Sequence, residues 1–331
     1  MDADVAMMAE ACAAGHEVRR ETAPNPWVGC VIETVDGARV TGATSPPPGA
    51  HAEVAAVEAA RRQGLTLRGA TVWVTLEPCS HDGRTGPCAD LLIDAGVGRV
   101  VVALEDPDPL VAGDGLKRLR AAGIDVAVGV LAAQVAEDLA PYLKHRRTGR
   151  PWVTLKLAAS LDGRTAAPDG TSQWITGAVA RADAHRLRAE HDAVLVGAGT
   201  VRADDPALTV RHAVGADPLR VVLGTASPDA RIHPCIELHG ELDEVLSNLA
   251  ARGVLSVLVE GGSTVAGAFH DAGLVDRYVV YLAPAVLGGS ARALLAGIGT
   301  NTLADAWRGE FLDVAMVGED VRVTLAPRTR D

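Results

Sequence analysis

Valine-rich apolar runs alternate along this chain with segments that have the apolar spacing of helices. The runs are continuously apolar, which is typical of strands covered by helices on both faces of a sheet. The predicted strands are 27–34, 71–76, 99–105, 124–130, 152–159, 193–197, 219–223, 255–259, 277–283, 311–317 and 320–326. The predicted helices are 4–20, 51–63, 87–95, 113–122, 132–146, 177–190, 241–252 and 263–272. This pattern predicts an α/β layered architecture.

The pattern of strands and helices occurs twice, with a polar, basic stretch between the two halves. That stretch, KHRRTGRP (144–151), carries a glycine and ends at a proline, so it is typical of a domain boundary. A chain of 331 residues has room for about two domains of roughly 150 residues each. We therefore predict one domain over 1–146 and a second over 147–331.

Charge and composition disfavour several classes of partner. The net charge of −11 repels phosphate backbones, so no nucleic-acid partner is expected, although a local basic pocket for one phosphate remains compatible with it. No apolar run approaches the roughly 18 residues of a membrane span, and the N-terminal segment mixes charges into its apolar residues, unlike a signal peptide. Five scattered cysteines are too few for a disulfide framework. We expect a cytoplasmic protein with no membrane partner.

One group of residues has the composition of a catalytic zinc site. His51 and Glu53 follow a proline-rich loop and open a predicted helix. Cys79 follows a predicted strand, and Cys88 begins another predicted helix. One imidazole and two thiolates supply three zinc ligands and leave a fourth position for water. Glu53 is placed to take a proton from that water, whose pKa zinc lowers to about 7, and to pass it to a leaving amine.

The spacing of these residues is that of zinc deaminases, with one departure. Their pattern is His-x-Glu followed by Pro-Cys and a second cysteine, with two residues between the cysteines, whereas eight residues separate the cysteines here. A structural zinc site, or two buried free cysteines, would explain the same residues without catalysis. The remaining cysteines lack such surroundings, so Cys12, Cys30 and Cys235 are predicted to be small packed side chains.

The cysteine segment resembles that of one enzyme family. TLEPCSHDGRTGPC (75–88) is similar to the long-spaced cysteine motif of the bifunctional riboflavin-biosynthesis deaminase/reductase. Further segments along nearly the whole chain match the same family in the same order: NPWVG (25–29), EDPDPLVAGDG (105–115), TLKLAASLDGR (154–164), SQWIT (172–176), LVGAGTVRADDPALTVR (195–211), VEGG (259–262) and APAVLGG (283–289). Several long motifs together are more specific than any single one.

The resemblance implies two consecutive reactions and two folds. A cytidine-deaminase-like three-layer domain, with Zn²⁺, would deaminate 2,5-diamino-6-(5-phosphoribosylamino)pyrimidin-4-one. A dihydrofolate-reductase-like domain would then reduce the ribosyl group to a ribityl chain with NADPH. The family also implies a homodimer formed through the reductase domain.

The resemblance assigns substrate contacts in the first domain. Asn25 would hold the substrate near the metal, and His81 and Arg84 would contact the base or its phosphate. A plain Asn-Pro turn and a solvated loop are the structural alternatives. Two positions depart from the family, which usually has lysine at Arg84 and asparagine at Asp108. At position 84, the planar guanidinium of arginine replaces the point charge of a lysine ammonium group. At position 108, an aspartate carboxylate replaces the N–H donor of asparagine. Any substrate contact at either position is therefore altered.

Glycine-rich segments follow three apolar strands of the second half, GAGT (197–200), EGG (260–262) and GG (288–289). Ligands of α/β proteins bind beyond the carboxyl ends of strands, although tight turns use the same residues. The family pattern places the substrate against Lys156, Thr176, Arg188, Arg211 and Glu260, with Asp204 assisting proton transfer. It places the cofactor against Ser160, Trp174, Gly197, Thr200, Gly261, Gly262 and Gly289. The structural alternatives are that Arg188 and Arg211 face water and that Trp174 is a core residue.

One segment of the second half is shorter than the family pattern. Between 231 and 255 the family usually has another strand and helix on the nucleotide side, and Gly224 stands where aspartate is common. Loss of an edge strand would weaken NADPH binding, so a second hypothesis is a deaminase whose degenerate C-terminal half serves only for dimerisation. A nucleic-acid-editing deaminase is disfavoured by the charge and by only five phenylalanine and tyrosine residues. A non-catalytic zinc module is the remaining alternative.

Overall fold

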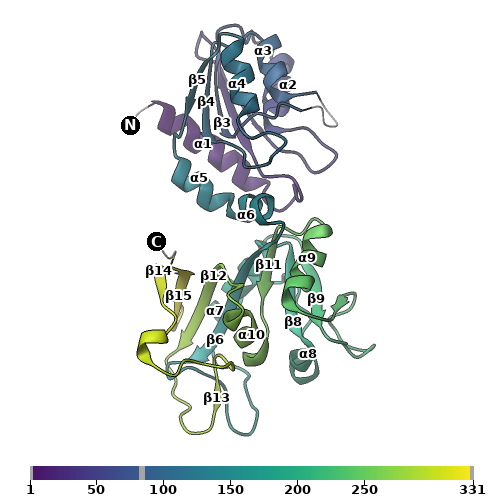
Figure 1. The fold of residues 1–331 in the computed structure, drawn as a ribbon, viewed down its shortest axis with the longest axis vertical. Helices are drawn as coiled ribbons and strands as arrows, with labels where there is room; N and C mark the ends of the chain where they lie inside the picture. Colours follow the sequence, from purple (N-terminus) through teal and green to yellow (C-terminus); the bar gives the residue numbers. More distant parts are fainter. Residues whose placement is uncertain (1–2, 82–85, 329–331) are drawn as a thin grey trace. The chain divides into compact units, whose positions relative to one another are not determined.

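The computed structural model describes residues 3–81 and 86–328. The chain forms two compact units, Met1–Arg150 and Pro151–Asp331. Each unit is built on one main sheet with helices packed against it, as the ribbon in Figure 1 shows. The predicted α/β layered architecture is therefore confirmed.

The first unit is a five-stranded sheet in the order β2-β1-β3-β4-β5. Its strands are β1 (Gly29–Glu33), β2 (Arg39–Ala43), β3 (Thr71–Leu76), β4 (Arg99–Leu104) and β5 (Asp125–Val128). Strand β1 is antiparallel to both neighbours, and β3, β4 and β5 are parallel. Its helices are α1 (Ala3–Glu17), α2 (Ala52–Arg62), α3 (Cys88–Asp94), α4 (Asp114–Ala121), α5 (Ala132–Asp138) and α6 (Ala140–Thr148).

Two glycines let helices approach the first sheet closely from opposite faces. A side chain on Gly29 of β1 would lie 1.8 Å from the carbonyl oxygen of Ala11 in α1. A side chain on Gly42 of β2 would lie 2.4 Å from the carbonyl oxygen of Ala52 in α2. Because Gly42 pairs with the residue after Gly29, the two positions point to opposite faces. Helices α1 and α2 therefore form separate layers around the sheet.

The second unit is an eight-stranded sheet in the order β10-β9-β8-β11-β6-β12-β15-β14. The strands from β10 to β12 are parallel, and β15 and β14 are antiparallel additions at one edge. These strands are β6 (Trp152–Ser160), β8 (Ala193–Gly197), β9 (Leu219–Leu223), β10 (Ile236–Leu238), β11 (Ser256–Val259), β12 (Arg277–Ala283), β14 (Gly309–Val317) and β15 (Asp320–Pro327). A small separate sheet pairs β7 (Arg164–Ala166) with β13 (Arg292–Ala293).

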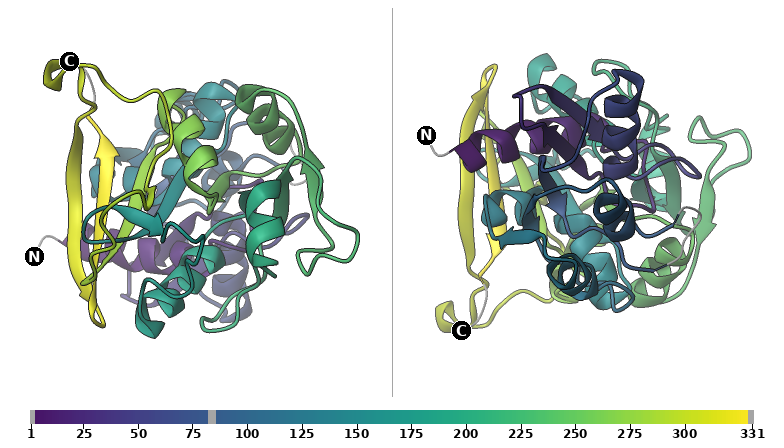
Figure 2. Two further views of the ribbon diagram at one scale, coloured as in Figure 1. Left: turned by 90° about the horizontal axis from the view of Figure 1, so that it is seen from below. Right: turned by 90° about the horizontal axis from the view of Figure 1, so that it is seen from above.

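Helices cover both faces of the second sheet, as Figure 2 shows from below. They are α7 (Ala178–Ala189), α8 (Ala198–Asp204), α9 (Leu242–Ala251) and α10 (Ser263–Asp271), with a short 3₁₀ helix η1 (Leu303–Asp305). Along β11, Val257 and Val259 pack in a core with α9 and α10, whereas Leu258 packs in a core with α7 and α8. This alternation explains why the parallel strands read as continuously apolar.

The structure corrects two predictions for the first unit. The single helix predicted over 132–146 is two helices, α5 and α6, because Pro141 in the first turn of α6 has no N–H to continue the preceding helix. Strand β2 was not predicted, since Arg39–Ala43 is short and mixes polar residues and a glycine.

The segment between 231 and 255 retains an edge strand. Strand β10 pairs in parallel with β9 at the edge of the eight-stranded sheet, and helix α9 follows it. The expectation that shortening had removed the edge strand is therefore wrong. Helix α8 was also missed, because its glycine-containing start was interpreted as a turn.

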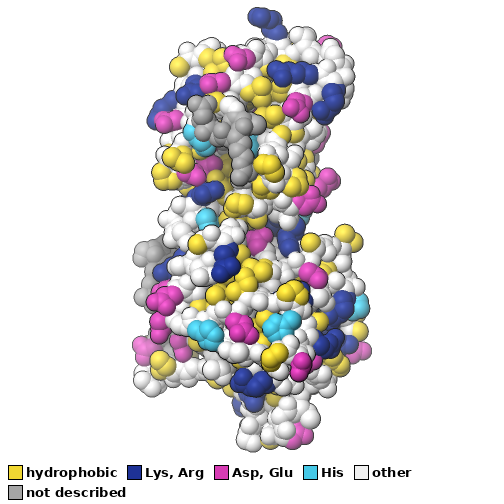
Figure 3. Space-filling model, turned by 90° about the vertical axis from the view of Figure 1, so that its right-hand side faces the viewer, with side chains coloured by type: hydrophobic (Ala, Val, Ile, Leu, Met, Phe, Trp, Pro, Cys, Tyr) yellow, Lys and Arg dark blue, Asp and Glu magenta, His cyan; other side chains and the backbone are white. Residues whose placement is uncertain are grey.

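Two surface properties bear on partners. Within residues 3–81 and 86–328, no helix combines the length and apolar composition that a bilayer crossing needs. On the face drawn in Figure 3, Lys and Arg side chains are interspersed with Asp and Glu side chains. Among the described residues visible in that view, the Lys and Arg side chains of each unit do not form the continuous basic surface that follows a nucleic-acid backbone.

Candidate functional site

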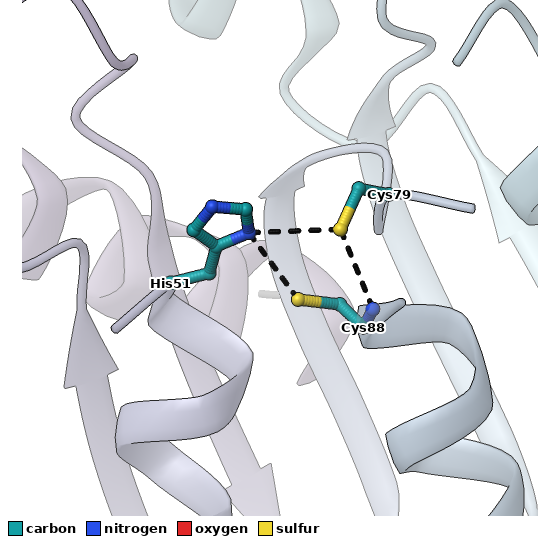
Figure 4. Close-up of side chains that lie close together, drawn as sticks. All are labelled: His51, Cys79 and Cys88. Atoms are coloured by element: carbon teal, nitrogen blue, oxygen red, sulfur yellow. Dashed lines mark hydrogen bonds between the residues drawn. The ribbon is translucent and has the colours of Figure 1, made fainter. Parts of the chain in front are cut away.

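The three predicted zinc ligands lie together in the first unit (Figure 4). His51 directly precedes α2, Cys79 lies in the loop after β3, and Cys88 is the first residue of α3. The His51 Nδ1 atom is 3.6 Å from Cys79 Sγ and 3.4 Å from Cys88 Sγ. The three ligand atoms all lie within 4.8 Å of one another.

These distances fit a tetrahedral zinc ion. With Zn–S bonds of about 2.3 Å and Zn–N bonds of about 2.0 Å, tetrahedral sulfur and nitrogen ligands lie about 3.5 Å apart. The two measured sulfur–nitrogen separations lie on either side of that value. In the part of the chain that the structure describes, no fourth His, Cys, Asp or Glu joins the cluster. The donor set therefore matches a catalytic zinc site with one open position.

The surroundings of Cys79 favour a thiolate. Hydrogen bonding with the Cys88 thiol and the His51 imidazole lowers the pKa of Cys79 to about 4, against the opposing effect of burial. The backbone N–H of Cys88 also donates to Cys79 Sγ at 3.4 Å. The loop after β3 and the start of α3 together prepare this sulfur to bind a cation.

Glu53 lies in the first turn of α2 and is buried beside the cluster. Burial, together with the charge of Cys79, raises the pKa of Glu53 to about 7. A carboxyl group with a pKa near neutrality can both accept and release a proton, which is the property required of a general acid and base.

A cavity of about 140 Å³ opens beside the cluster. Its lining includes Glu53 and the predicted substrate residues Asn25 and His81. The Nδ1 atom of His81 is buried and has no hydrogen-bond partner among the described residues. Arg84 lies outside the described residues. Asn25 accepts a hydrogen bond at its carbonyl from the Thr22 hydroxyl at 3.1 Å, so its loop is fixed at the cavity edge.

The far wall of this cavity contains polar residues that sequence reasoning did not assign. The Tyr142 hydroxyl donates to Asp106 Oδ2 at 3.0 Å, and burial raises the pKa of Asp106. Arg146 lies 3.4 Å from Asp108 Oδ2 and over the Tyr142 ring. The charge that Asp108 introduces is thus balanced by Arg146. The EDPDPLVAGDG motif supplies Asp106 and Asp108 and was the only sequence signal for this wall. Tyr142 and Arg146 come from helix α6, which is distant in sequence.

Glu77 and Gly115 hold that wall against the zinc-ligand loop. The buried Glu77 carboxylate accepts backbone N–H groups of Asp106 at 3.2 Å, Gly113 at 3.0 Å and Leu116 at 3.1 Å. A side chain on Gly115 would lie 2.0 Å from the carbonyl oxygen of Pro78. The loop before α4 can therefore pack directly on the segment that carries Cys79.

The second unit has two adjoining cavities at the carboxyl ends of its parallel strands, of about 450 and 930 Å³. The smaller contains predicted substrate residues and three of the other predicted site residues: Lys156, Thr176, Arg188, Arg211, Glu260, Asp204, Trp174 and Thr200. The larger contains predicted cofactor residues, Gly197, Thr200 and Gly262. Thr200 and Asp204 line both, so a ligand in one cavity would lie next to a ligand in the other.

A buried ion pair forms the base of the smaller cavity. Both guanidinium nitrogens of Arg188 that face Glu260 donate to its carboxylate, whose side chain is 7% exposed. Burial alone would raise the pKa of Glu260, but the Arg188 charge lowers it to about 2. Lys156 Nζ lies 3.9 Å from the same carboxylate, and burial lowers the pKa of Lys156. Arg188 is therefore engaged by Glu260 before any phosphate arrives.

Trp174 and Asp204 lie at the mouth of this cavity. Trp174 is 69% exposed, with the Arg181 guanidinium 4.6 Å from its ring centre, so the alternative of a core tryptophan is excluded. The Gln173 amide donates to Asp204 Oδ1 at 3.3 Å. Arg181 also donates to the Thr176 carbonyl at 2.7 Å.

The predicted cofactor residues divide into two groups. The Thr200 hydroxyl accepts the Gly262 N–H at 3.1 Å, which joins the glycine-rich ends of β8 and β11 at the larger cavity. Ser160, Gly261 and Gly289 do not line either cavity. Ser160 instead donates to Asp162 Oδ1 at 2.6 Å within the turn after β6.

Helix α7 carries basic side chains beside the cavity that sequence reasoning missed, although burial lowers the pKa of His185. Arg181 and His185 line the same region as Arg188, together with His212. The spacing of 181, 185 and 188 places all three on one face of a helix, so this periodicity could have found them.

Comparisons with known proteins agree with this geometry. Residues 1–104 match the cytidine and deoxycytidylate deaminase zinc-binding region, and residues 151–323 match the RibD C-terminal domain. The riboflavin biosynthesis protein RibD of Mycobacterium tuberculosis is 47% identical over 95% of this chain and 94% of its own. That of Escherichia coli is 41% identical over 96% of this chain and 98% of its own.

Solved structures show the same fold over both units. RibD of Acinetobacter baumannii has a TM-score of 0.91 and 39% identity, covering 98% of this chain and 99% of its own. A diaminohydroxyphosphoribosylaminopyrimidine deaminase/5-amino-6-(5-phosphoribosylamino)uracil reductase from Thermotoga maritima has a TM-score of 0.86 and 32% identity, with coverage of 98% and 99%. The chain therefore belongs to the RibD family of riboflavin biosynthesis proteins, with a zinc-binding deaminase domain and a reductase domain in one polypeptide.

Proposed function

We propose that residues 1–146 deaminate 2,5-diamino-6-(5-phosphoribosylamino)pyrimidin-4-one and that residues 147–331 reduce the ribosyl group of the product to ribityl with NADPH. The observation that carries the first step is the cluster of His51, Cys79 and Cys88 beside the buried Glu53. The Thermotoga maritima relative has both activities in its description.

In the first step, His51, Cys79 and Cys88 would hold a zinc ion, which when bound would lower the pKa of a water molecule to about 7. Glu53, with a pKa of about 7, receives a proton and delivers it to the departing amino group. Asn25 and His81 line the cavity, where they would hold the ring. Arg84 would contact the base or its phosphate.

In the second step, Gly197, Thr200 and Gly262 would hold NADPH in the larger cavity, and the bound cofactor would be the source of the hydride. Lys156, Thr176 and Asp204 lie around the sugar, and Asp204 handles its proton. Arg211 and Arg188 take the phosphate, with Glu260 orienting Arg188 through two hydrogen bonds. Trp174 borders the cofactor, whereas Ser160, Gly261 and Gly289 shape the turns that support it.

The test measures ammonia release and NADPH oxidation by the full chain with the diaminopyrimidine nucleotide. Glu53→Gln should lower ammonia release by roughly 10²–10⁴-fold while zinc content is unchanged. Glu58→Gln is the matched control, because Glu58 is exposed on the same helix. Unchanged turnover in Glu53→Gln would refute the proton-carrying role. Ammonia release without any NADPH oxidation would favour the deaminase with a degenerate second half.

Two further properties complete the proposal. A homodimer forms through the reductase unit, because edge strand β14 exposes Phe311 (70%), Val314 (60%) and Met316 (68%). Light scattering should give a dimer that Val314→Lys dissociates, and a monomeric wild type would contradict it. A cytoplasmic location fits the five free cysteines, because a reducing compartment keeps thiols from forming disulfides.

A further inference from the structure

A second group of metal-ligand side chains lies in the reductase unit, away from its cavities. His233, Cys235 and Glu237 each offer one ligand atom, and these atoms lie within 4.8 Å of one another. Cys235, predicted to be a small packed residue, is instead only partly buried between two exposed side chains. Neither the deamination nor the reduction uses this group.

The chain folds locally so that the three side chains converge. Cys235 and Glu237 lie two residues apart at the entry to and within strand β10 (Ile236–Leu238), where alternate residues point to one side, and His233 lies in the turn that leads into the strand. The Cys235 Sγ atom lies 3.4 Å from His233 Nδ1. The same separation joins Cys88 Sγ to His51 Nδ1 in the deaminase cluster. The sulfur and nitrogen are thus spaced for one shared cation.

Contacts from outside the group orient its ligands. His233 Nε2 lies 2.9 Å from the Ser227 carbonyl, which can only accept, so that nitrogen carries the proton. The lone pair of Nδ1 therefore faces the Cys235 sulfur. A metal-bound histidine usually donates its other N–H to a carbonyl in this way. Glu237 Oε1 accepts the Ala226 N–H at 2.9 Å, which fixes the carboxylate.

We propose that His233, Cys235 and Glu237 form a second zinc site, separate from the deaminase site. One imidazole, one thiolate and one carboxylate are a donor set that Zn²⁺ accepts, and its partial exposure leaves a fourth position for water or a ligand from another molecule. The ion would clip the loop 224–235 to β10. The same loop carries Arg231, which lines the substrate cavity and whose N–H donates to Asp205 Oδ1 at 2.8 Å.

The test is the metal content of the full chain after equilibration with buffered Zn²⁺. The wild type should bind about two zinc ions, one for each cluster, and Cys235→Ser about one. Cys12→Ser and His239→Ala are matched controls, a partly buried cysteine and an exposed histidine outside the group, and should still bind about two. Cys88→Ser should lose the deaminase zinc and keep the second, which separates the two sites.

Cobalt gives a second readout that does not depend on turnover. Two thiolates serve the deaminase cluster and one serves the proposed site, so Cys235→Ser should remove about one third of the thiolate-to-cobalt absorbance. His233→Ala should remove the same fraction. One zinc per wild-type chain, or a zinc content and cobalt spectrum unaffected by Cys235→Ser, would overturn the proposal and leave only a thiol–imidazole hydrogen bond.

Discussion

The ion pair between Arg188 and Glu260 should make the stability of the reductase unit depend on pH in acid. The pKa of Glu260 is about 2 in the folded chain, against an ordinary value of 4.5. A depressed pKa stabilises the fold at pH values above 4.5, and that contribution is lost as the pH falls through 4.5 toward 2. Since one unit of pKa corresponds to about 1.4 kcal/mol, the ionised carboxylate contributes about 3 kcal/mol at pH 6.

The same linkage gives the size of the effect in acid. At pH 3 the unfolded glutamate is almost fully protonated while the folded one is still largely ionised, so about 1 kcal/mol of the contribution remains. Glu260→Gln has no carboxylate to titrate and leaves Arg188 buried without its partner. The difference in unfolding free energy between wild type and Glu260→Gln should therefore shrink by about 2 kcal/mol between pH 6 and pH 3.

Hydrogen exchange of the full chain measures this difference within the unit concerned. Amides of β11, which directly precedes Glu260, report on unfolding around the ion pair. At each pH the ratio of exchange rates between variant and wild type cancels the intrinsic rate. The ratio should fall roughly 30-fold from pH 6 to pH 3, since 1.4 kcal/mol is a factor of ten. A ratio that stays constant, or that falls already between pH 8 and 6, would refute the reasoning.

Three further changes have defined outcomes. Gly42→Ala pushes a methyl group into the backbone of α2, so it should lower the free energy of unfolding in urea by about 1–3 kcal/mol and weaken zinc binding. Gly199→Ala is the control, because a methyl group there meets no atom within 4 Å. Equal effects of the two substitutions would contradict the packing role of Gly42. Thr200→Val removes the acceptor for Gly262 N–H and should raise the Kd for NADPH roughly fivefold by fluorescence titration, with ammonia release unchanged. Tyr142→Phe removes the hydroxyl that donates to Oδ2 of the buried Asp106, leaving only the Asp108 N–H on Oδ1, and should destabilise the deaminase unit by about 1.5–3 kcal/mol with full zinc content; loss of zinc would point to a different role.

Much of the fold was readable from the sequence because its strands are buried on both faces. The apolar runs 193–197 and 277–283 coincide with β8 and β12, because a short, continuously apolar stretch is typical of a strand that is buried on both faces. Short edge elements were missed for the opposite reason. Strand β2 and strand β10 are held mainly by their neighbours and carry polar residues, so local pattern does not mark them.

The candidate sites divide in a similar way. His51, Cys79 and Cys88 were found because zinc limits its ligands to few residue types, which remain visible whatever the spacing between them. Tyr142 and Arg146 were not found, because tyrosine and arginine are common and only the tertiary fold brings α6 to the cavity. The pairing of Arg188 with Glu260 was equally hidden, since 72 residues separate the two partners.

The wall that the two reductase cavities have in common makes their occupants thermodynamically interdependent. Gln173, Thr200 and Asp204 line both cavities. The ligand that binds first therefore orders residues that also form the binding site of the second ligand. Reciprocity then requires that nucleotide and sugar phosphate alter each other's dissociation constant by one common factor. The ratio of reduced to oxidised nucleotide would consequently affect the second reaction in two ways. It would set the supply of hydride, and it would change how tightly the deaminated intermediate is bound.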